Sequence, residues 1–236
     1  WNQRIWGKII IIFLYKCAFY GKKVKGIFQN SDDMNIFLSR SIIAPEKSIV
    51  IESCGIDLDY FNSIKYQVEN KSNTPFTFLF LSRMLFDKGL NELYLAALEL
   101  YKERKDFEVI LAGEIDAGNL LSAKQEWIET ISARKPIQWV GFIEDTPKLI
   151  FDADIIILPS YHEGFSQTLL EALAMGRPII TTDVPGCREL VDGNGYLVKP
   201  KDIKELKIAM QKAMLSKDKL SKMGQKSRKL SMKYDN

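Results

Sequence analysis

Residues 155–176 read Ile-Ile-Ile-Leu-Pro-Ser-Tyr-His-Glu-Gly-Phe-Ser-Gln-Thr-Leu-Leu-Glu-Ala-Leu-Ala-Met-Gly. The four apolar residues at the start are typical of a buried strand, which we expect to end at Pro159. Apolar side chains then recur at helical spacing at Leu169, Leu170, Leu173 and Met175. Gly176, followed by Pro178, is typical of the end of a helix. The stretch therefore predicts a strand, a polar loop and a helix, in that order.

The same alternation of strand and helix extends on both sides of this stretch. Strands are predicted at 76–81, 107–112, 137–140, 154–158, 178–181 and 196–198. Helices are predicted at 88–104, 121–133, 146–152 and 167–175, with a short helix near 187–191 and two lysine-rich helices after residue 198. Strands that alternate with helices at this spacing form βαβ units. We therefore predict an α/β fold with a doubly wound, parallel, Rossmann-like sheet.

A shorter set of elements precedes this alternation. We predict a helix at 3–20, a strand at 24–29, a helix at 32–39 with Ser31 as its N-cap, and a strand at 48–52. Residues 62–75 are polar and form the best linker candidate. The chain is therefore divided into residues 1–60 and residues 61–236.

Composition places the chain among ordinary globular proteins. The 236 residues are 46% hydrophobic and 27% charged, which suits a protein that buries a core. The formal net charge of +3 gives no overall electrostatic footprint for nucleic acid. Three cysteines without a Cys-x-x-Cys pair favour reduced cytosolic thiols over disulfides or a zinc site. The sequence begins with Trp rather than Met, so we expect a native start upstream.

Two segments carry an excess of positive charge. Residues 1–26 contain six Lys or Arg, no acid and several aromatic residues. Two interpretations stay open here: an interfacial patch that touches an anionic bilayer, or a buried helix with a basic edge. The apolar run at 9–15 is too short to span a bilayer, which takes about 20 residues. Residues 199–236 contain twelve Lys and Arg against four acids, and we interpret this excess as a solvated helical surface.

Two carboxylates, Glu163 and Glu171, stand eight positions apart across the predicted loop and helix. Glu163 is expected at the carboxyl end of a strand, and Glu171 about one turn into the following helix. Ligands of open α/β sheets bind at this edge. The backbone amides that lead into the helix, with Ser166 as N-cap, suit a phosphate group. Together these groups predict a ligand with both hydroxyls and phosphate, such as a nucleotide sugar.

Further candidate residues lie at the ends of neighbouring strands. Arg83 and Lys88 flank the loop after strand 76–81, where two cations would neutralise a diphosphate. Gly141 and Phe142 follow another strand, at a point where a base would lie against the main chain. Each of these motifs is weak evidence alone. They are stronger candidates for one binding site because all of them are predicted at the same edge of the sheet.

No metal site is expected. His162 is the single histidine, which excludes a histidine-based cluster in this chain, and we interpret it as an ordinary loop residue. Asp152-Ala-Asp154 resembles an Asp-x-Asp metal motif, but it precedes its strand, whereas that motif follows one. We therefore reject it as a metal site.

The motifs also occur together, and in the same order, in a known family. They are Arg83-x4-Lys88, Trp139-Val-Gly-Phe142, Ala153-Asp154 leading into Leu158-Pro-Ser160, Glu163-x7-Glu171, and Thr182-Asp-Val-Pro-Gly-Cys-Arg-Glu189 followed by Asn194-Gly195. In this order they resemble the retaining glycosyltransferases of sequence family 4, which have the two-domain GT-B fold. The segment that ends at Glu189 is most similar to the bacterial subgroup that builds capsule and O-antigen repeat units. The resemblance covers about residues 20–236 and implies the C-terminal, donor-binding half of a GT-B fold plus the end of its N-terminal domain.

The resemblance implies a role for each candidate residue. Arg83 and Lys88 would hold the donor diphosphate and stabilise the leaving group, and Glu163 would orient the sugar. Glu171 would bind ribose. The remaining donor-binding residues would be Gly164, Phe165, Ser166, Gln167 and Thr168, whose amides face phosphate, with Gly141 and Phe142 beside the base.

The resemblance further implies a metal-independent hexosyl- or N-acetylhexosaminyltransferase that needs no cofactor. It would move a sugar from a UDP-hexose or UDP-N-acetylhexosamine to a polyprenyl-diphosphate-linked glycan. It would work in the cytoplasm at the inner face of the membrane, with peripheral membrane contact and without nucleic acid. We expect the fragment alone to bind the donor weakly and to be inactive. Two alternatives stay open: a UDP-sugar epimerase of the same two-domain fold, and a non-catalytic nucleotide-sugar-binding module.

Overall fold

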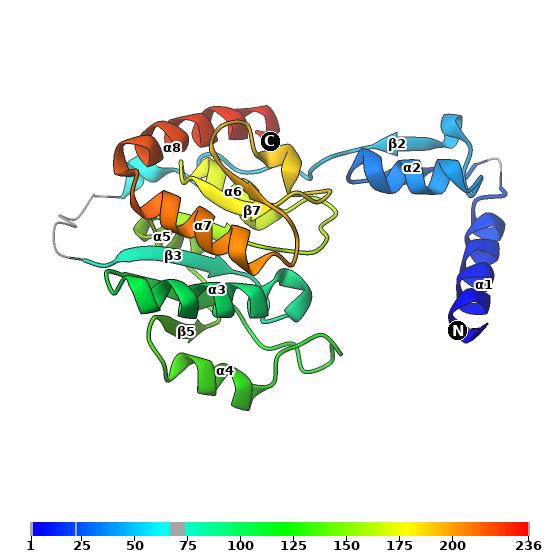
Figure 1. Ribbon diagram of the computed structural model, residues 1–236. Coiled ribbons are helices and arrows are strands. Elements are labelled where there is room, and N and C mark those ends of the chain that lie inside the picture. Colours follow the sequence, from blue (N-terminus) through cyan, green and yellow to red (C-terminus); the bar gives the residue numbers. More distant parts are fainter. Residues whose placement is uncertain (1, 22, 67–73, 236) are drawn as a thin grey trace. The chain divides into compact units, whose positions relative to one another are not determined.

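The computed structural model describes residues 2–21, 23–66 and 74–235 of the chain. The chain divides into two compact units, Trp1–Cys54 and Gly55–Asn236 (Figure 1). The second unit begins a few residues before the division at residue 60 that the sequence predicts. Much of the predicted linker, residues 67–73, lies outside the described residues.

The first unit contains a small parallel ladder and two helices. Its elements are α1 (Asn2–Ala18), β1 (Gly26–Phe28), α2 (Ser31–Ser39), the 3-10 helix η1 (Pro45–Lys47) and β2 (Ser48–Val50). Both strands are shorter than predicted. The prediction of Ser31 as N-cap of α2 is wrong, because the Asn30 side chain accepts a hydrogen bond from the Asp33 amide at 2.7 Å.

Helix α1 leaves most of its apolar side chains in solvent. The exposed fractions are 51% for Ile9, 55% for Ile10 and 64% for Phe13. The interpretation of this segment as a buried helix is therefore wrong for this chain. Within residues 2–21, 23–66 and 74–235, α1 and every other helix is too short or too polar to cross a bilayer.

The second unit is built on a six-stranded, fully parallel sheet with the order β5-β4-β3-β6-β7-β8. The strands are β3 (Phe76–Leu81), β4 (Phe107–Ala112), β5 (Ile137–Gly141), β6 (Ile155–Leu158), β7 (Ile179–Thr182) and β8 (Gly195–Val198). The chain winds outward from β3 in one direction, then returns to β6 and winds in the other. The order reverses between β3 and β6, which confirms the doubly wound, Rossmann-like prediction.

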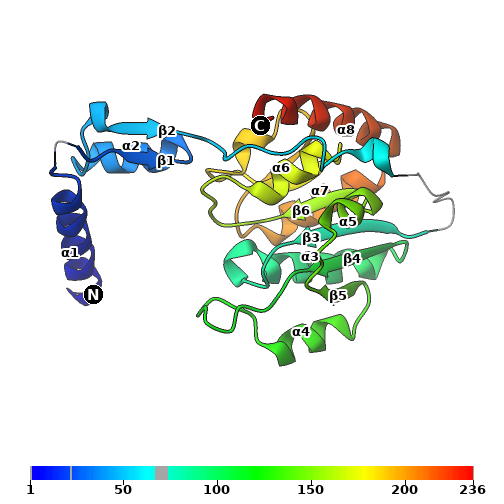
Figure 2. The same ribbon diagram turned by 180° about the vertical axis from the view of Figure 1, so that it is seen from behind.

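Helices cover both faces of this sheet (Figures 1 and 2). They are α3 (Leu90–Glu103), α4 (Gln125–Ser132), α5 (Thr146–Asp152), α6 (Gln167–Ala174), α7 (Ile203–Met214) and α8 (Lys217–Ser231). The 3-10 helices of this unit are η2 (Ser63–Lys65), η3 (Phe86–Lys88), η4 (Arg188–Leu190) and η5 (Met232–Tyr234). Helices α3 and α7 pack together on one face, and α5 and α6 lie on the other.

Two helices begin later than the sequence predicts. The helix predicted from residue 88 begins at Leu90, because Gly89 takes a left-handed conformation with φ of 77° after the 3-10 turn η3. The helix predicted from residue 121 begins at Gln125. The preceding loop pairs instead with the loop after β3, where Phe86 donates to the Leu121 carbonyl at 2.9 Å.

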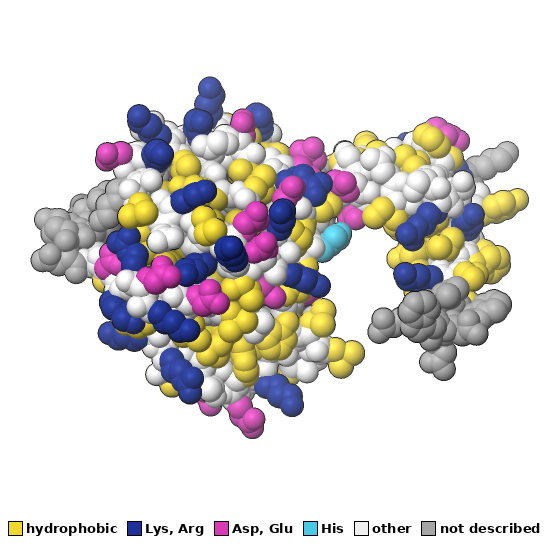
Figure 3. All heavy atoms as spheres, in the orientation of Figure 1, with side chains coloured by type: hydrophobic (Ala, Val, Ile, Leu, Met, Phe, Trp, Pro, Cys, Tyr) yellow, Lys and Arg dark blue, Asp and Glu magenta, His cyan; other side chains and the backbone are white. Residues whose placement is uncertain are grey.

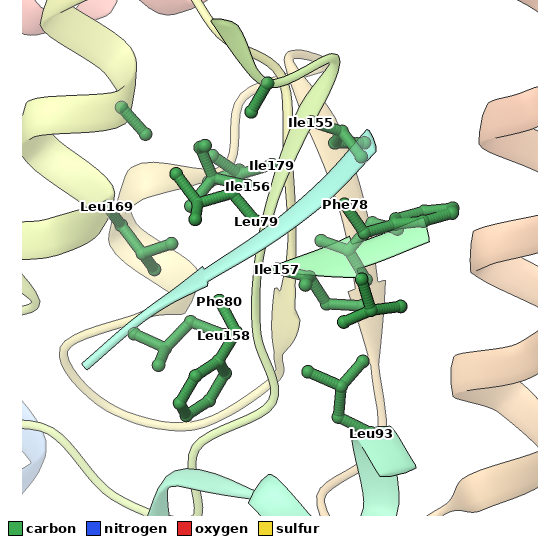
Figure 4. Packing of buried hydrophobic residues seen from close by; sticks show 14 of the residues in the cluster. Phe78, Leu79, Phe80, Leu93, Ile155, Ile156, Ile157, Leu158, Leu169 and Ile179 are labelled. Carbon is green, nitrogen blue, oxygen red and sulfur yellow. The ribbon is translucent and has the colours of Figure 1, made fainter. Parts of the chain in front are cut away.

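The core explains why the strands are continuous apolar runs. Phe78, Leu79 and Phe80 of β3 are fully buried, as are Ile155, Ile156 and Ile157 of β6. Successive side chains of a strand point to opposite faces, so both faces of these central strands are covered. Figure 4 shows them packed with Leu93 of α3, Leu169 of α6 and Ile179 of β7. This packing fixes the carboxyl ends of β3 and β6 side by side.

Candidate active site

The loops that follow β3 and β6 meet at the point where the strand order reverses. Lys88, after β3, donates to both carboxylate oxygens of Glu163, after β6, with each N–O distance 2.8 Å. The two side chains are only 19% and 13% exposed. A cation and an anion predicted to serve one ligand are thus in direct contact across the switch point.

A glycine brings these two loops together. A Cβ on Gly89 would stand 2.1 Å from the Pro159 carbonyl oxygen, so the close approach requires glycine. The Tyr161 amide donates to the Asp87 carbonyl at 2.8 Å and joins the loops a second time. Two backbone contacts therefore hold together the loops that carry Lys88 and Glu163.

A pocket of about 260 Å³ opens at the same edge of the sheet. Its lining residues come from the ends of β3, β4 and β5, from the start of α5 and from α6: Leu81, Ser82, Arg83, Ala112, Gly113, Glu114, Phe142, Ile143, Thr146, Thr168 and Glu171. Four residues predicted from the sequence, Arg83, Phe142, Thr168 and Glu171, thus share one cavity. Phe142 is 71% exposed at its rim.

Glu171 is the electrostatically unusual residue of the pocket. Burial raises the pKa of its carboxyl from 4.5 to about 7. The carboxyl projects from α6 one turn after Ser166, whose side chain caps the helix by accepting from the Leu169 amide at 3.4 Å. Near neutral pH this group changes charge readily.

Arg83 has a partner that the sequence did not reveal. Its guanidinium donates to the Asp116 carboxylate at 2.6 Å, and its side chain is 52% exposed. Asp116 lies in the loop after β4, 33 positions further along the chain. No local pattern marks this residue, because the contact depends on the pairing of β3 with β4.

The loop that is predicted to bind phosphate is braced by residues 185–186. The Glu163 amide donates to the Pro185 carbonyl at 3.3 Å, and the Ser166 amide donates to the Gly186 carbonyl at 2.8 Å. The Ser166 amide therefore serves the loop itself in this structure. The Phe165 side chain is 8% exposed and lies against Tyr234, with ring centroids 5.2 Å apart. The predicted donor contacts of Gly164, Phe165, Ser166, Gln167 and Thr168 stay predictions.

The structure also shows the surroundings of Gly141, His162 and the two aspartates of the rejected metal motif. Gly141 has a φ of 73° and open space where a Cβ would stand. His162 is exposed in the loop, as expected. The Asp154 carboxylate accepts from the Thr77 amide at 2.8 Å, and Asp152 pairs with Lys148. Both aspartates of the rejected metal motif thus have structural partners.

Cys187 is a further residue near the site that the sequence analysis did not single out. It is fully buried, and burial raises the pKa of its thiol to about 12. The thiol is accordingly protonated at neutral pH and contributes to packing rather than to nucleophilic chemistry.

With this geometry in place, comparisons with known proteins identify the family. Residues 62–230 match the family described as glycosyl transferases group 1. The chain therefore belongs to this family, which confirms the resemblance seen in its motifs. A solved glycosyltransferase from Rickettsia africae shares the fold with a TM-score of 0.77 and 26% sequence identity, over 93% of this chain and 62% of that one.

Two curated relatives have named activities. One, from Campylobacter jejuni, is N,N'-diacetylbacillosaminyl-diphospho-undecaprenol alpha-1,3-N-acetylgalactosaminyltransferase, 31% identical over 84% of this chain and 53% of its own length. The other, from Escherichia coli, is UDP-Gal:alpha-D-GlcNAc-diphosphoundecaprenol alpha-1,3-galactosyltransferase, 26% identical over 83% of this chain and 51% of its own length. The chain spans about half the length of these relatives.

Proposed function

We propose that the protein to which this chain belongs is a retaining, metal-independent glycosyltransferase. It transfers a hexose or N-acetylhexosamine from a UDP-sugar to a polyprenyl-diphosphate-linked glycan, at the cytoplasmic face of the membrane, in cell-surface polysaccharide synthesis. The observation that carries the proposal is the Lys88–Glu163 pair at the same edge of the sheet as the pocket that contains Arg83 and Glu171. Two relatives named for undecaprenyl-diphosphate-linked acceptors, one of them with a UDP-Gal donor, support the choice of substrates.

In the proposed complex, Lys88 and Arg83 face the donor diphosphate. The Lys88 ammonium has three donors, so it can keep Glu163 while it donates to a phosphate oxygen. The forked Arg83 guanidinium gives paired hydrogen bonds and stabilises the leaving diphosphate. Glu171 accepts hydrogen bonds from the ribose hydroxyls, and Phe142 lies against the base.

The reaction would exchange one carbon–oxygen bond for another at the anomeric carbon. The bond to the diphosphate oxygen breaks while a bond to the acceptor hydroxyl oxygen forms on the same face of the sugar. The departing phosphate takes the proton of the acceptor hydroxyl, so the step needs no further base. Glu163, fixed by Lys88, orients the sugar hydroxyls during this exchange.

Calorimetric titration with UDP tests the donor site directly. We expect this chain to bind UDP with a dissociation constant in the millimolar range or below, and to transfer no sugar alone. Because charge-assisted phosphate contacts are strong, Arg83→Gln should weaken binding about tenfold. Arg83 is half exposed, so this variant should keep its fold. The exposed Lys135→Gln, away from the pocket, is the matched control and should bind like the wild type.

Two outcomes would contradict the proposal. One is a folded chain that gives no binding heat with UDP at millimolar concentration. The other is equal UDP affinity of wild type and Arg83→Gln. For the complete protein, conversion of a UDP-sugar without any acceptor would favour the epimerase alternative instead.

A further inference from the structure

Helix α8 carries a row of lysines along one side. Lys219, Lys222, Lys226 and Lys229 are all exposed. At about 100° per residue they fall within about 80° of the helix circumference. Lys233 continues the row in the 3-10 turn that follows. Figure 3 shows Lys and Arg side chains gathered over α8 at the top of the view.

The opposite side of α8 anchors the helix and fixes the direction of the row. Leu220 is 8% exposed, and Ser227 is fully buried. At Gly224, an added Cβ would stand 2.3 Å from the Gly176 carbonyl oxygen, so the helix lies directly on the end of α6. Arg228 donates to the carbonyls of Phe61 and Ala174 and holds the helix further. The lysine row therefore faces solvent in a fixed orientation.

The lysines of the row differ in their pairing from other cations of the same unit. Elsewhere in this unit, cations such as Arg83, Lys88 and Lys207 contact carboxylates at 2.5 to 2.8 Å. Among the described residues, the five lysines of the row form no such pair. Like charges three and four positions apart repel each other on a helix, so the row costs the helix stability.

Three acidic residues lie near the row, although the sequence from Lys219 to Lys233 itself contains no Asp or Glu. Asp218 lies in the first turn of α8, Asp192 neighbours Gly193 beside the Lys226 side chain, and Asp235 follows η5. The row itself is uniformly cationic over about 20 Å.

We propose that this lysine row docks the protein on the headgroups of an anionic lipid bilayer. The row is straight and runs along one exposed side of the helix, so it fits an extended surface rather than a small ion. It contains neither Arg for paired phosphate contacts nor an aromatic ring for base stacking, and this favours a bilayer over a nucleic acid. Met232, 58% exposed beside Lys233, adds an apolar side chain at one end. The choice of a bilayer as partner rests on the proposed function, because its acceptor is anchored in lipid.

Vesicle sedimentation with the chain tests the proposal. Wild type should bind vesicles of phosphatidylcholine with about one third phosphatidylglycerol, and not vesicles of phosphatidylcholine alone. Each lysine near an anionic leaflet contributes about fivefold in partitioning, so K222Q/K226Q/K229Q should lower it by about a hundredfold. High salt should also weaken binding to the anionic vesicles, because it screens the attraction between lysines and headgroups. The control K102Q/K124Q/K135Q removes the same charge from exposed positions outside the row and should change binding less than about threefold.

Several results would overturn the proposal. These are equal vesicle binding of wild type and the α8 variant, equal loss in the control variant, and tighter binding to single-stranded RNA than to anionic vesicles. Loss of vesicle binding in Ile10→Ser/Phe13→Ser, with the α8 variant unaffected, would assign the contact to α1 instead.

UDP titration of the α8 variant separates the docking proposal from the proposed function. The α8 variant should bind UDP like the wild type. Vesicle binding without any UDP binding would remove the proposed function and leave the docking face intact.

Discussion

Glu171 is the residue with the most strongly shifted pKa among those that line the candidate pocket. Its side chain projects from α6 into the pocket lining, and burial raises the pKa of its carboxyl to about 7. In the proposed complex, the hydroxyls of a bound diol would donate hydrogen bonds to this carboxylate. The sequence predicted Glu171 as a ligand-binding residue, but its burial follows from the packing of α6 against the sheet.

Glu171→Gln is expected to remove a pH dependence of stability. The folded-state pKa of about 7 lies above the ordinary 4.5, so the stabilising contribution is complete only below about 4.5 and is lost as pH rises through about 7. From about pH 5 to about pH 9, the unfolding free energy of wild type should fall by up to about 3 kcal/mol more than that of Glu171→Gln. Urea unfolding across this range measures the difference. Glu144→Gln, at an exposed position, should follow wild type, and parallel curves for Glu171→Gln and wild type would refute the expectation.

At the scale of elements, two glycines at neighbouring strand ends have different reasons to be glycine. Gly113 follows β4 with a φ of 140°, and a Cβ there would stand 1.9 Å from the Ser82 carbonyl oxygen. Gly141 ends β5 with a φ of 73° but has open space around the Cβ position. The first glycine permits a close approach of two loops, and the second only relieves backbone strain.

Alanine substitution should separate these two roles. Gly141→Ala adds left-handed strain alone and should lower the free energy of unfolding by about 1 kcal/mol. Gly113→Ala adds a collision with backbone, so we expect a loss of about 3 kcal/mol or more. Urea unfolding of both variants gives the comparison. Similar losses for the two would show that the loops after β3 and β4 adjust freely.

At the scale of the whole molecule, the second unit contains its own core. All residues of the main hydrophobic cluster, from Ile56 to Leu230, belong to it. The segment just after the boundary is part of the same structure, because the Ile56 amide donates to the Tyr234 carbonyl at 2.8 Å. The unit therefore has the contacts that a separately folding domain requires.

A chain limited to residues 55–236 should fold with an unchanged urea midpoint and bind UDP like the longer chain. Residues 76–236 form the control, since they lack the buried Ile56 and Phe61 and should unfold at lower urea concentration. Circular dichroism and calorimetry give both readouts. Failure of residues 55–236 to fold would mean that the first unit supports the second.

The sequence determined the fold class and the family residues, because these depend on local patterns. Apolar runs, helical spacing and the order of motifs are carried by neighbouring residues, and they located Arg83, Lys88, Glu163 and Glu171 in advance. The predicted ends of elements were less accurate. The helix predicted from residue 88 begins at Leu90, because the left-handed Gly89 lies against the backbone of a distant loop. Only the tertiary structure decided the contacts between distant residues: Lys88 with Glu163 across 75 positions and Arg83 with Asp116 across 33. Those contacts arise from strand pairing, which no single stretch of sequence encodes.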